Sequence, residues 1–432
     1  MKWHPASMML ATWCFAVMLL YTLPFQLVGR TVTAYGFEIL ALLLVTFCGA
    51  ALLASPWIQQ RKSATLVAPS FKVADIVMMI VSLVAIFSSL LELYSGSGGD
   101  LSASWLVRDS RAGAMLSGSA SESSLAFQIG FLTSPIAYAA IARHVIFDET
   151  IRFPRLLLIG FGPPAAAALA SGGRGPLGFA LVFFALAMMV RSYIRHDPSR
   201  ARKRASGRQI FFAAVIVIIF LMSLNYFVSV FAARQGGDIS EGMFDIVADR
   251  WGVTFGGPHA DAMIAVLGEG NTYLIFLFSW YYIQGLVFSN ILFTDYNGSP
   301  MWGLYGIELL LAAMRRINPE YVADRYAELN ALDVFGFVPS AFGTFFVDLR
   351  WLCFVAVFIW GWLAGLVYKK CRTSQDARWL LVAPFVMQGI FFSTINSPLG
   401  LTNGLATLAW MILVFILSKP RVAQLRARPS FQ

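Results

Sequence analysis

Long apolar runs recur along the whole chain, and they constrain its fold more than any other feature. Runs able to cross about 30 Å of hydrocarbon lie at residues 8–27, 35–57, 73–94, 126–146, 156–170, 176–193, 210–231, 351–368, 379–393 and 405–417. Hydrophobic residues make up 58% of the 432 residues and charged residues only 13%, a composition that is not typical of a water-soluble protein. The sequence therefore predicts an all-α polytopic integral membrane protein with about ten transmembrane helices.

The basic residues fall in particular connections between these runs. The strongest cluster, at 191–208, is placed in the cytoplasm by the positive-inside rule. Alternation along the chain puts the other clusters on the same side: Arg61, Lys62, Lys72, Arg143, Arg152, Arg155, Lys369, Lys370, Arg372, Arg378, Lys419, Arg421, Arg426 and Arg428. The net charge of +9 is thus a topology signal and not a nucleic-acid footprint. Both termini are expected in the cytoplasm, and the segments 95–125, 171–175 and 232–348 on the outer face.

The long outer segment leaves the number of helices open. Residues 274–293 are apolar enough to cross the membrane, and the shorter apolar stretch 301–314 could cross back. The choice is therefore between ten and twelve transmembrane helices. We favour ten helices, with both stretches re-entrant or lying along the outer interface. The reason is that aromatic and polar side chains typical of the membrane–water interface occur together at Trp280, Tyr281, Tyr282, Gln284 and Asn290. The expected organisation is a bundle of about seven helices at 1–231, an outer helical loop at 232–348, and further transmembrane helices with a cytoplasmic tail at 349–432.

The cytoplasmic connections carry no nucleotide-binding signature. The largest is short and basic, with no strand pattern and no glycine fingerprint, which argues against a site for a sugar nucleotide or ATP. The cysteines have neither disulfide nor zinc spacing. We therefore expect no cofactor and no metal, and a substrate that arrives through the membrane or from outside.

The outer turn at 171–176, SGGRGP, is the tightest motif in the chain. Its glycines allow backbone N–H groups to converge, and Pro176 suits the start of a helix whose N-terminus carries partial positive charge. With Arg174 added, the turn is fit to bind phosphate or pyrophosphate. The equally weighted alternative is a compact interfacial turn with a snorkelling arginine.

Asp348 and Arg350 lie at the mouth of the predicted span 351–368. Ionisable groups in or near a membrane span carry a large desolvation penalty, so this pair is a functional-site hypothesis by default. His259 is the only histidine expected on the outer face, where it could act as a general base or be an ordinary solvated residue.

Two further outer segments are predicted to be helical. Residues 241–251 are predicted to form an amphipathic surface helix with carboxylates along one face. Arg234 and Arg250 flank this helix, and their guanidinium groups could reach an anionic headgroup. The segment around Pro319 is predicted to form two helices with a break between them, which places Arg315, Arg316 and Arg325 above the membrane.

Taken in order, several of these segments resemble the bacterial oligosaccharide repeat-unit polymerases of the Wzy type, which make O-antigen and exopolysaccharide. The resemblance covers roughly the C-terminal two thirds and rests on SGGRGPLGFALVFF, WYYIQGL, WGLYGIELLLAAM, the Asn330 segment before VFGFVPSAFGTFFVDLRW, and a span that closes on Gly361, Trp362 and Gly365. The family typically has an aspartate, an aromatic residue and a glycine at the start of that span. Here Asp348-Leu349-Arg350 keeps the aspartate but not the glycine.

The resemblance implies a metal-independent glycosyltransferase of the inner membrane, with an architecture like that of GT-C polymerases and ligases. Its substrate would be an undecaprenyl-diphosphate-linked oligosaccharide used on the periplasmic face, with a chain-length co-polymerase and a flippase as partners. Arg174, with one or more of Arg234, Arg250 and Arg350, would bind pyrophosphate, and Asp348 or His259 would act as base. Arg174 and Asp348 follow from the family pattern, whereas the other residues are placed by their location.

Two other functions remain open. A lipid-linked polysaccharide ligase would use the same donor and a similar outer loop. A precursor flippase or transporter would be expected to have charged residues at mid-membrane and repeated halves, and no internal repeat is visible in this sequence.

Overall fold

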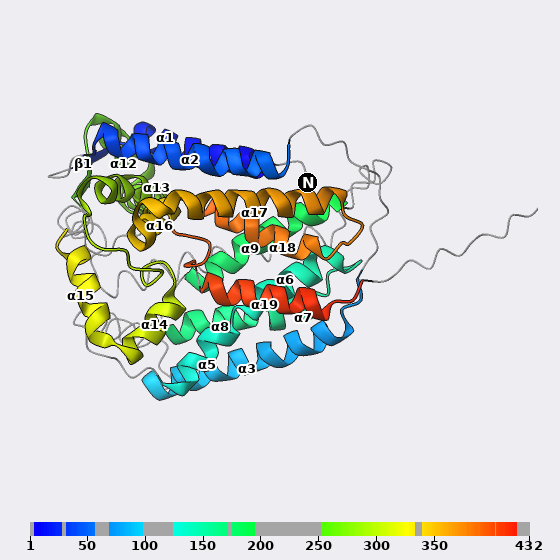
Figure 1. The fold of residues 1–432 in the computed structure, drawn as a ribbon. Coiled ribbons are helices and arrows are strands. Elements are labelled where there is room, and N and C mark those ends of the chain that lie inside the picture. Colours follow the sequence, from blue (N-terminus) through cyan, green and yellow to red (C-terminus); the bar gives the residue numbers. More distant parts are fainter. Residues whose placement is uncertain are drawn as a thin grey trace, which may run out of the picture.

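The computed structural model describes residues 4–27, 32–56, 69–97, 124–171, 175–194, 252–332, 339–401 and 403–420. Helices dominate these residues (Figure 1), as predicted. The first half contains α1 (Pro5–Thr22), β1 (Phe25–Leu27), α2 (Ala34–Ala54), α3 (Lys72–Ser97), α5 (Leu125–Thr133), α6 (Ile136–Phe147), α7 (Phe153–Leu156), the π-helix η2 (Leu157–Phe161), α8 (Gly162–Ser171) and α9 (Gly175–Ile194). The second half contains β2 (Val253–Phe255), α12 (Pro258–Leu267), α13 (Glu269–Asp295), α14 (Glu308–Ile317), α15 (Pro319–Asn330), α16 (Ala341–Leu349), the 3₁₀ turn η3 (Arg350–Leu352), α17 (Cys353–Thr373), α18 (Trp379–Phe391) and α19 (Gly404–Leu417).

Helical stretches long and apolar enough to span a membrane agree with the predicted multi-pass membrane protein. Within the described residues there are seven: Pro5–Thr22, Ala34–Ala54, Lys72–Ser95, Leu125–Phe147, Phe153–Ser171, Gly175–Ser192 and Ala341–Thr373. Helices α18 and α19 are apolar but shorter. The predicted span at 210–231 lies outside the described residues, so the total of ten stays a prediction.

Close packing between α2 and α17 explains two glycines in the C-terminal span. A Cβ atom added to Gly361 would lie 2.4 Å from the Phe47 carbonyl oxygen, and one added to Gly365 would lie 2.5 Å from the Ala51 carbonyl oxygen. Small residues four apart on one helix let two backbones approach in this way. The four-residue spacing of Gly361 and Gly365 therefore lets α17, and with it α16, pack against the N-terminal helices.

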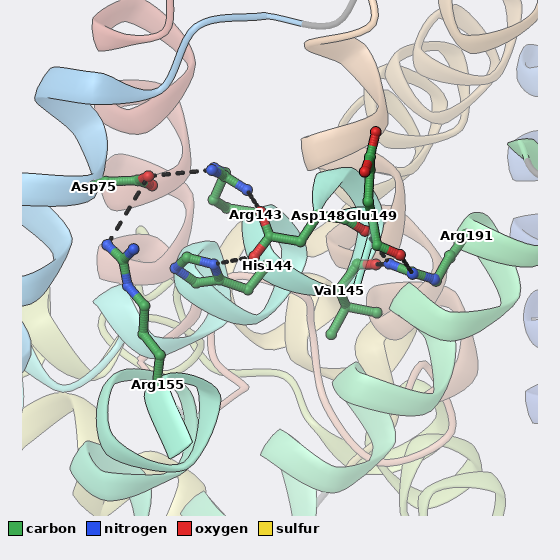
Figure 2. A network of polar contacts seen from close by, with 8 residues as sticks. All are labelled: Asp75, Arg143, His144, Val145, Asp148, Glu149, Arg155 and Arg191. Atoms are coloured by element: carbon green, nitrogen blue, oxygen red, sulfur yellow. Dashed lines mark hydrogen bonds and ion pairs between the residues drawn. The ribbon is translucent and has the colours of Figure 1, made fainter. Parts of the chain in front are cut away.

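A cluster of basic residues and their acidic partners lies at one end of the bundle. Arg143 bonds Asp75 at 3.1 Å and Asp148 at 2.5 Å, and Arg191 donates to the backbone carbonyl oxygen of Asp148 at 2.7 Å (Figure 2). At the same end the backbone of Ser70 pairs with that of Lys419. This end, called the basic end below, is the one that the sequence predicts to be cytoplasmic.

The opposite end carries the short sheet β1–β2 and the helices α12 to α15 (Figure 1). The predicted break at Pro319 is confirmed, because α14 ends at Ile317 and Asn318 caps α15 by accepting the Tyr321 N–H at 3.0 Å. The predicted amphipathic helix at 241–251 lies outside the described residues.

The interpretation of α13 as a wet interfacial segment needs correction. Trp280, Gln284 and Asn290 are buried within the protein, at 1%, 2% and 1% exposure. Asn290 bonds the backbone of Thr33, accepting from its N–H and donating to its carbonyl oxygen, both at 2.8 Å. Gln284 donates to the Tyr281 carbonyl oxygen at 3.1 Å. Gln284 and Asn290 thus find their partners inside the fold, so their polarity did not indicate contact with water.

Candidate functional site

A cavity of about 460 Å³ lies at the end opposite the basic end, between helices that are distant in the sequence. Its lining comes from α3, α5, α6, α8, α9, α13, the first residue of α14, and the connection between α18 and α19. The lining residues used below are Glu92, Phe127, Phe131, Tyr138, Ser171, Pro176, Tyr281, Glu308, Asn396 and Asn403.

Aromatic side chains form much of the cavity wall. Phe127 and Phe131 stack with ring centroids 6.0 Å apart, and Tyr138 packs edge-on against Phe183 at 5.2 Å. Flat apolar surfaces with a few polar groups between them are typical of small-molecule sites. Such walls suit the C–H faces of sugar rings.

Asn403 supplies a hydrogen-bonding group that the protein leaves unused. The residue is buried, adopts a positive φ of 58°, and donates from its amide nitrogen to the Phe131 carbonyl oxygen at 2.8 Å. Its Oδ1 atom is buried and has no hydrogen-bond partner within the described part of the chain. A buried acceptor without a partner is rare in folded proteins, so the Asn403 side chain keeps unused hydrogen-bonding capacity beside the cavity.

Two carboxylates from different helices line the cavity. Glu92 of α3 accepts a hydrogen bond from the Ser124 hydroxyl. Glu308, the first residue of α14, has accessible surface that faces the cavity, and no hydrogen bond or ion pair of its carboxylate is found among the described residues. Burial by the surrounding protein raises the pKa of Glu308 to about 7. This carboxyl group can therefore gain or lose a proton near neutral pH.

Two residues that flank the centre of the predicted phosphate-binding turn line this cavity. Ser171 ends α8 and Pro176 is the second residue of α9, and both side chains line the cavity. The N-terminus of α9 carries partial positive charge and backbone N–H groups free of intrahelical partners. Arg174 itself lies outside the described residues, as do Arg234 and Arg250, so their predicted roles stay predictions.

Asp348 lies at a helix break and not at the start of a span. The helical stretch begins at Ala341 and is interrupted at Arg350, so the predicted mouth of the span is an internal kink. The Asp348 carboxylate accepts the backbone N–H groups of Gly303 and Tyr305 at 3.0 Å and of Gly306 at 2.8 Å. Asp348 does not line the cavity. Its carboxylate anchors the loop before α14, which favours a positioning role over that of a base.

Arg350 is engaged with aromatic rings. Its guanidinium lies 4.6 Å from the Phe346 ring centroid and 5.0 Å from that of Tyr296, and it donates to the Tyr296 carbonyl oxygen. The residue has a positive φ of 51°, a conformation that non-glycine residues seldom adopt. These contacts join Arg350 to Phe346 of α16 and to Tyr296 at the C-terminal end of α13.

His259 is an exposed residue near the start of α12. The preceding strand β2 pairs with β1, which follows α1, and α12 packs against α13. His259 is not part of the cavity lining. The structure therefore does not bring His259 together with Asp348 or with the cavity.

Sequence reasoning missed Glu92, Glu308 and Asn403 as site residues. Glu308 had a usable signal, since it is a single acid at the head of the apolar run ELLLAAM. Within the described residues no group of three or more His, Cys, Asp or Glu side chains is placed to hold a metal ion. Comparison of the chain with known protein families, with curated proteins and with solved structures found no match.

Proposed function

We propose that this protein is a membrane glycosyltransferase that polymerises polyprenyl-diphosphate-linked oligosaccharide repeat units. The cavity at the end opposite the basic end is the observation that carries this proposal. It lies among apolar helices, and it combines aromatic walls, unused hydrogen-bonding capacity and a carboxyl group able to titrate near neutral pH.

Each part of such a substrate has a counterpart in or beside the cavity. Sugar rings would contact Phe127, Phe131 and Tyr281, and their hydroxyls would bond Asn403 and Asn396. The diphosphate would bind at the N-terminus of α9, where Arg174 adds a guanidinium from the preceding turn. The lipid tail would stay in the bilayer around the helices.

The proposed orientation follows from charge. Because the basic end is expected in the cytoplasm, the cavity would open toward the periplasmic side of the bacterial inner membrane, with both termini in the cytoplasm. Substrate would reach it after a flippase has moved the lipid-linked repeat across the membrane. A chain-length co-polymerase is the expected protein partner.

A lipid-linked polysaccharide ligase is the second candidate, because it would bind the same diphosphate donor. The two functions predict different intermediates in cells that lack the protein. Loss of a polymerase leaves lipid-linked single repeats, whereas loss of a ligase leaves long lipid-linked polymer. Extraction and sizing of lipid-linked glycans from such cells tests the proposal, and accumulation of long lipid-linked chains would contradict it.

A further inference from the structure

We propose that Glu308 removes the proton from the acceptor hydroxyl in the cavity, and that Asp348 positions Glu308 through the loop 301–306. This inference rests on the proposed function, because it assigns the base for that reaction. It replaces Asp348 and His259, which the sequence offered for the same role and which do not line the cavity.

Glu308 is the cavity carboxylate that is not engaged by a neighbouring side chain. Glu92, on α3, accepts the Ser124 hydroxyl. Within the described residues the Glu308 carboxylate has no such partner, its side chain keeps accessible surface on the cavity wall, and desolvation raises its pKa to about 7. A general base works best when its pKa lies near the working pH and when its lone pairs are open to the substrate.

The charged groups around Glu308 are engaged elsewhere. On its own helix, the Arg315 guanidinium lies 5.7 Å from the Tyr326 ring centroid of α15, and Arg316 donates to Gln128 of α5 at 3.1 Å. The other titratable groups of the cavity lining are Glu92 on α3, Tyr138 on α6 and Tyr281 on α13. Further groups on neighbouring elements are Tyr305 in the loop before α14, Tyr326 on α15 and Asp348 on α16. Glu308 is therefore the cavity group expected to set the pH dependence of the reaction.

The loop 301–306, which precedes α14, determines the position of Glu308. Asp348 accepts three N–H groups from this loop, the last of them from Gly306, two residues before Glu308. The Asp348 backbone carbonyl also accepts the Trp302 N–H at 2.9 Å. Asp348 thus accepts four hydrogen bonds from this loop and holds it in one conformation. Helix α14 therefore begins at a fixed place on the cavity wall.

The transfer step balances without a further reactant. The acceptor hydroxyl oxygen forms a bond to C1 of the donor sugar, and its proton moves to the Glu308 carboxylate. The bond between C1 and the diphosphate oxygen breaks, and its electron pair leaves with the lipid diphosphate. Glu308 then releases the proton to water, which restores the carboxylate for the next transfer.

The test measures initial rates of repeat-unit transfer by the purified full-length protein over pH 5–9. The variants are Glu308→Gln, Glu308→Asp and Asp348→Asn, with Glu320→Gln as the matched control. Glu320 is an exposed acid in the first turn of α15 and does not line the cavity. Thermal unfolding in detergent shows whether each variant is folded.

We expect kcat of the wild type to rise with pH through about 7. Glu308→Gln should lower kcat by roughly 100-fold or more, with KM changed little, and should abolish that rise. Glu308→Asp should keep the rise at a lower kcat, and it keeps the test decisive if the Gln variant does not fold. Asp348→Asn should lower kcat but keep the rise, and Glu320→Gln should match the wild type.

Two results would overturn the assignment. A folded Glu308→Gln variant within threefold of the wild-type rate would exclude Glu308 as the base. Loss of the pH-dependent rise in Asp348→Asn, with the rise kept in Glu308→Gln, would make Asp348 the titrating group. Failure of the proposed function looks different, because the wild type itself would then form no glycosidic bond.

Discussion

The Oδ2 atom of Asp348 accepts a hydrogen bond from the backbone N–H of Gly306 at 2.8 Å, inside the protein. A Cβ atom added to Gly306 would lie 2.6 Å from this same oxygen and 2.6 Å from Cγ2 of Thr344. The buried helix α16 and the loop that leads to the cavity therefore meet where only glycine fits. Through this contact, packing within the bundle determines the position of Glu308.

Replacement of Gly306 by alanine should damage both stability and activity. The added methyl group must displace the Asp348 carboxylate or the loop backbone, and overpacking of this kind costs about 1–3 kcal/mol. We expect a lower thermal unfolding midpoint in detergent and a lower kcat, with the protein still inserted in the membrane.

Gly49→Ala is the matched control for that change. Gly49 lies inside α2, and a Cβ atom there would have no atom within 4 Å. Alanine is favoured over glycine in a helix by up to about 1 kcal/mol, so stability should be unchanged or higher and activity unchanged. Equal effects of the two substitutions would contradict the Asp348–Gly306 account.

Arg350→Lys should weaken the fold without weakening donor binding. Lysine keeps the charge but lacks the planar group that lies against the rings of Phe346 and Tyr296. A contact of this type contributes about 0.5–2 kcal/mol, so the unfolding midpoint should fall while KM for the lipid-linked donor stays the same. A tenfold rise in KM at unchanged stability would instead restore Arg350 to the predicted pyrophosphate site.

The ion-pair network at the basic end should make stability depend on acid pH. Burial raises the pKa of Asp148, but hydrogen bonds from His144 and Arg143 outweigh this effect and lower it from 3.8 to about 2. A lowered folded-state pKa means that the stabilisation is present above pH 4 and is lost as the pH falls toward 2. It amounts to about 2 kcal/mol.

Asp148→Asn therefore lowers the unfolding midpoint at neutral pH, and the difference from the wild type should disappear toward pH 2. The measurement is thermal unfolding in detergent over pH 2–7. Glu149→Gln is the control, since the Glu149 side chain points away from the network in Figure 2 and Arg191 donates to its backbone carbonyl, which the substitution keeps. A pH-independent difference between Asp148→Asn and the wild type would contradict this assignment.

Arg174→Ala should lower polymer length and rate at normal protein levels, and Arg174→Lys should recover them only in part. The guanidinium can bond two phosphate oxygens at once, whereas an ammonium acts as a point charge. Gel analysis of the polymer, with immunodetection of the protein in membranes, measures both effects. Normal polymer from the alanine variant would remove Arg174 from the pyrophosphate site and leave it as a residue of an interfacial turn.

The helices could be predicted from sequence because their signals are local. Apolar runs gave the spans, and Asn318 followed by Pro319 gave the break between α14 and α15. The kink at Arg350 has no such signal, because its positive φ is held by contacts with Phe346 and Tyr296. The burial of α13 was also missed, since the sequence does not tell whether a polar side chain meets water or another residue of the protein.

The candidate site was only partly predictable. The turn at 171–176 was identified from its glycines and its proline, and its flanking residues do line the cavity. Glu308 was missed because the cavity joins it to α3 and α9, which precede it by more than a hundred residues. Asp348 was singled out correctly as a buried charge, but its partners are backbone N–H groups that the sequence does not reveal.

The most direct test uses purified protein and one defined polyprenyl-diphosphate-linked repeat unit. We predict a ladder of lipid-linked oligomers, each longer by one repeat, with one lipid diphosphate released for every bond formed. Repeats that only cross a vesicle membrane, with no bond made and no lipid diphosphate released, would contradict the account.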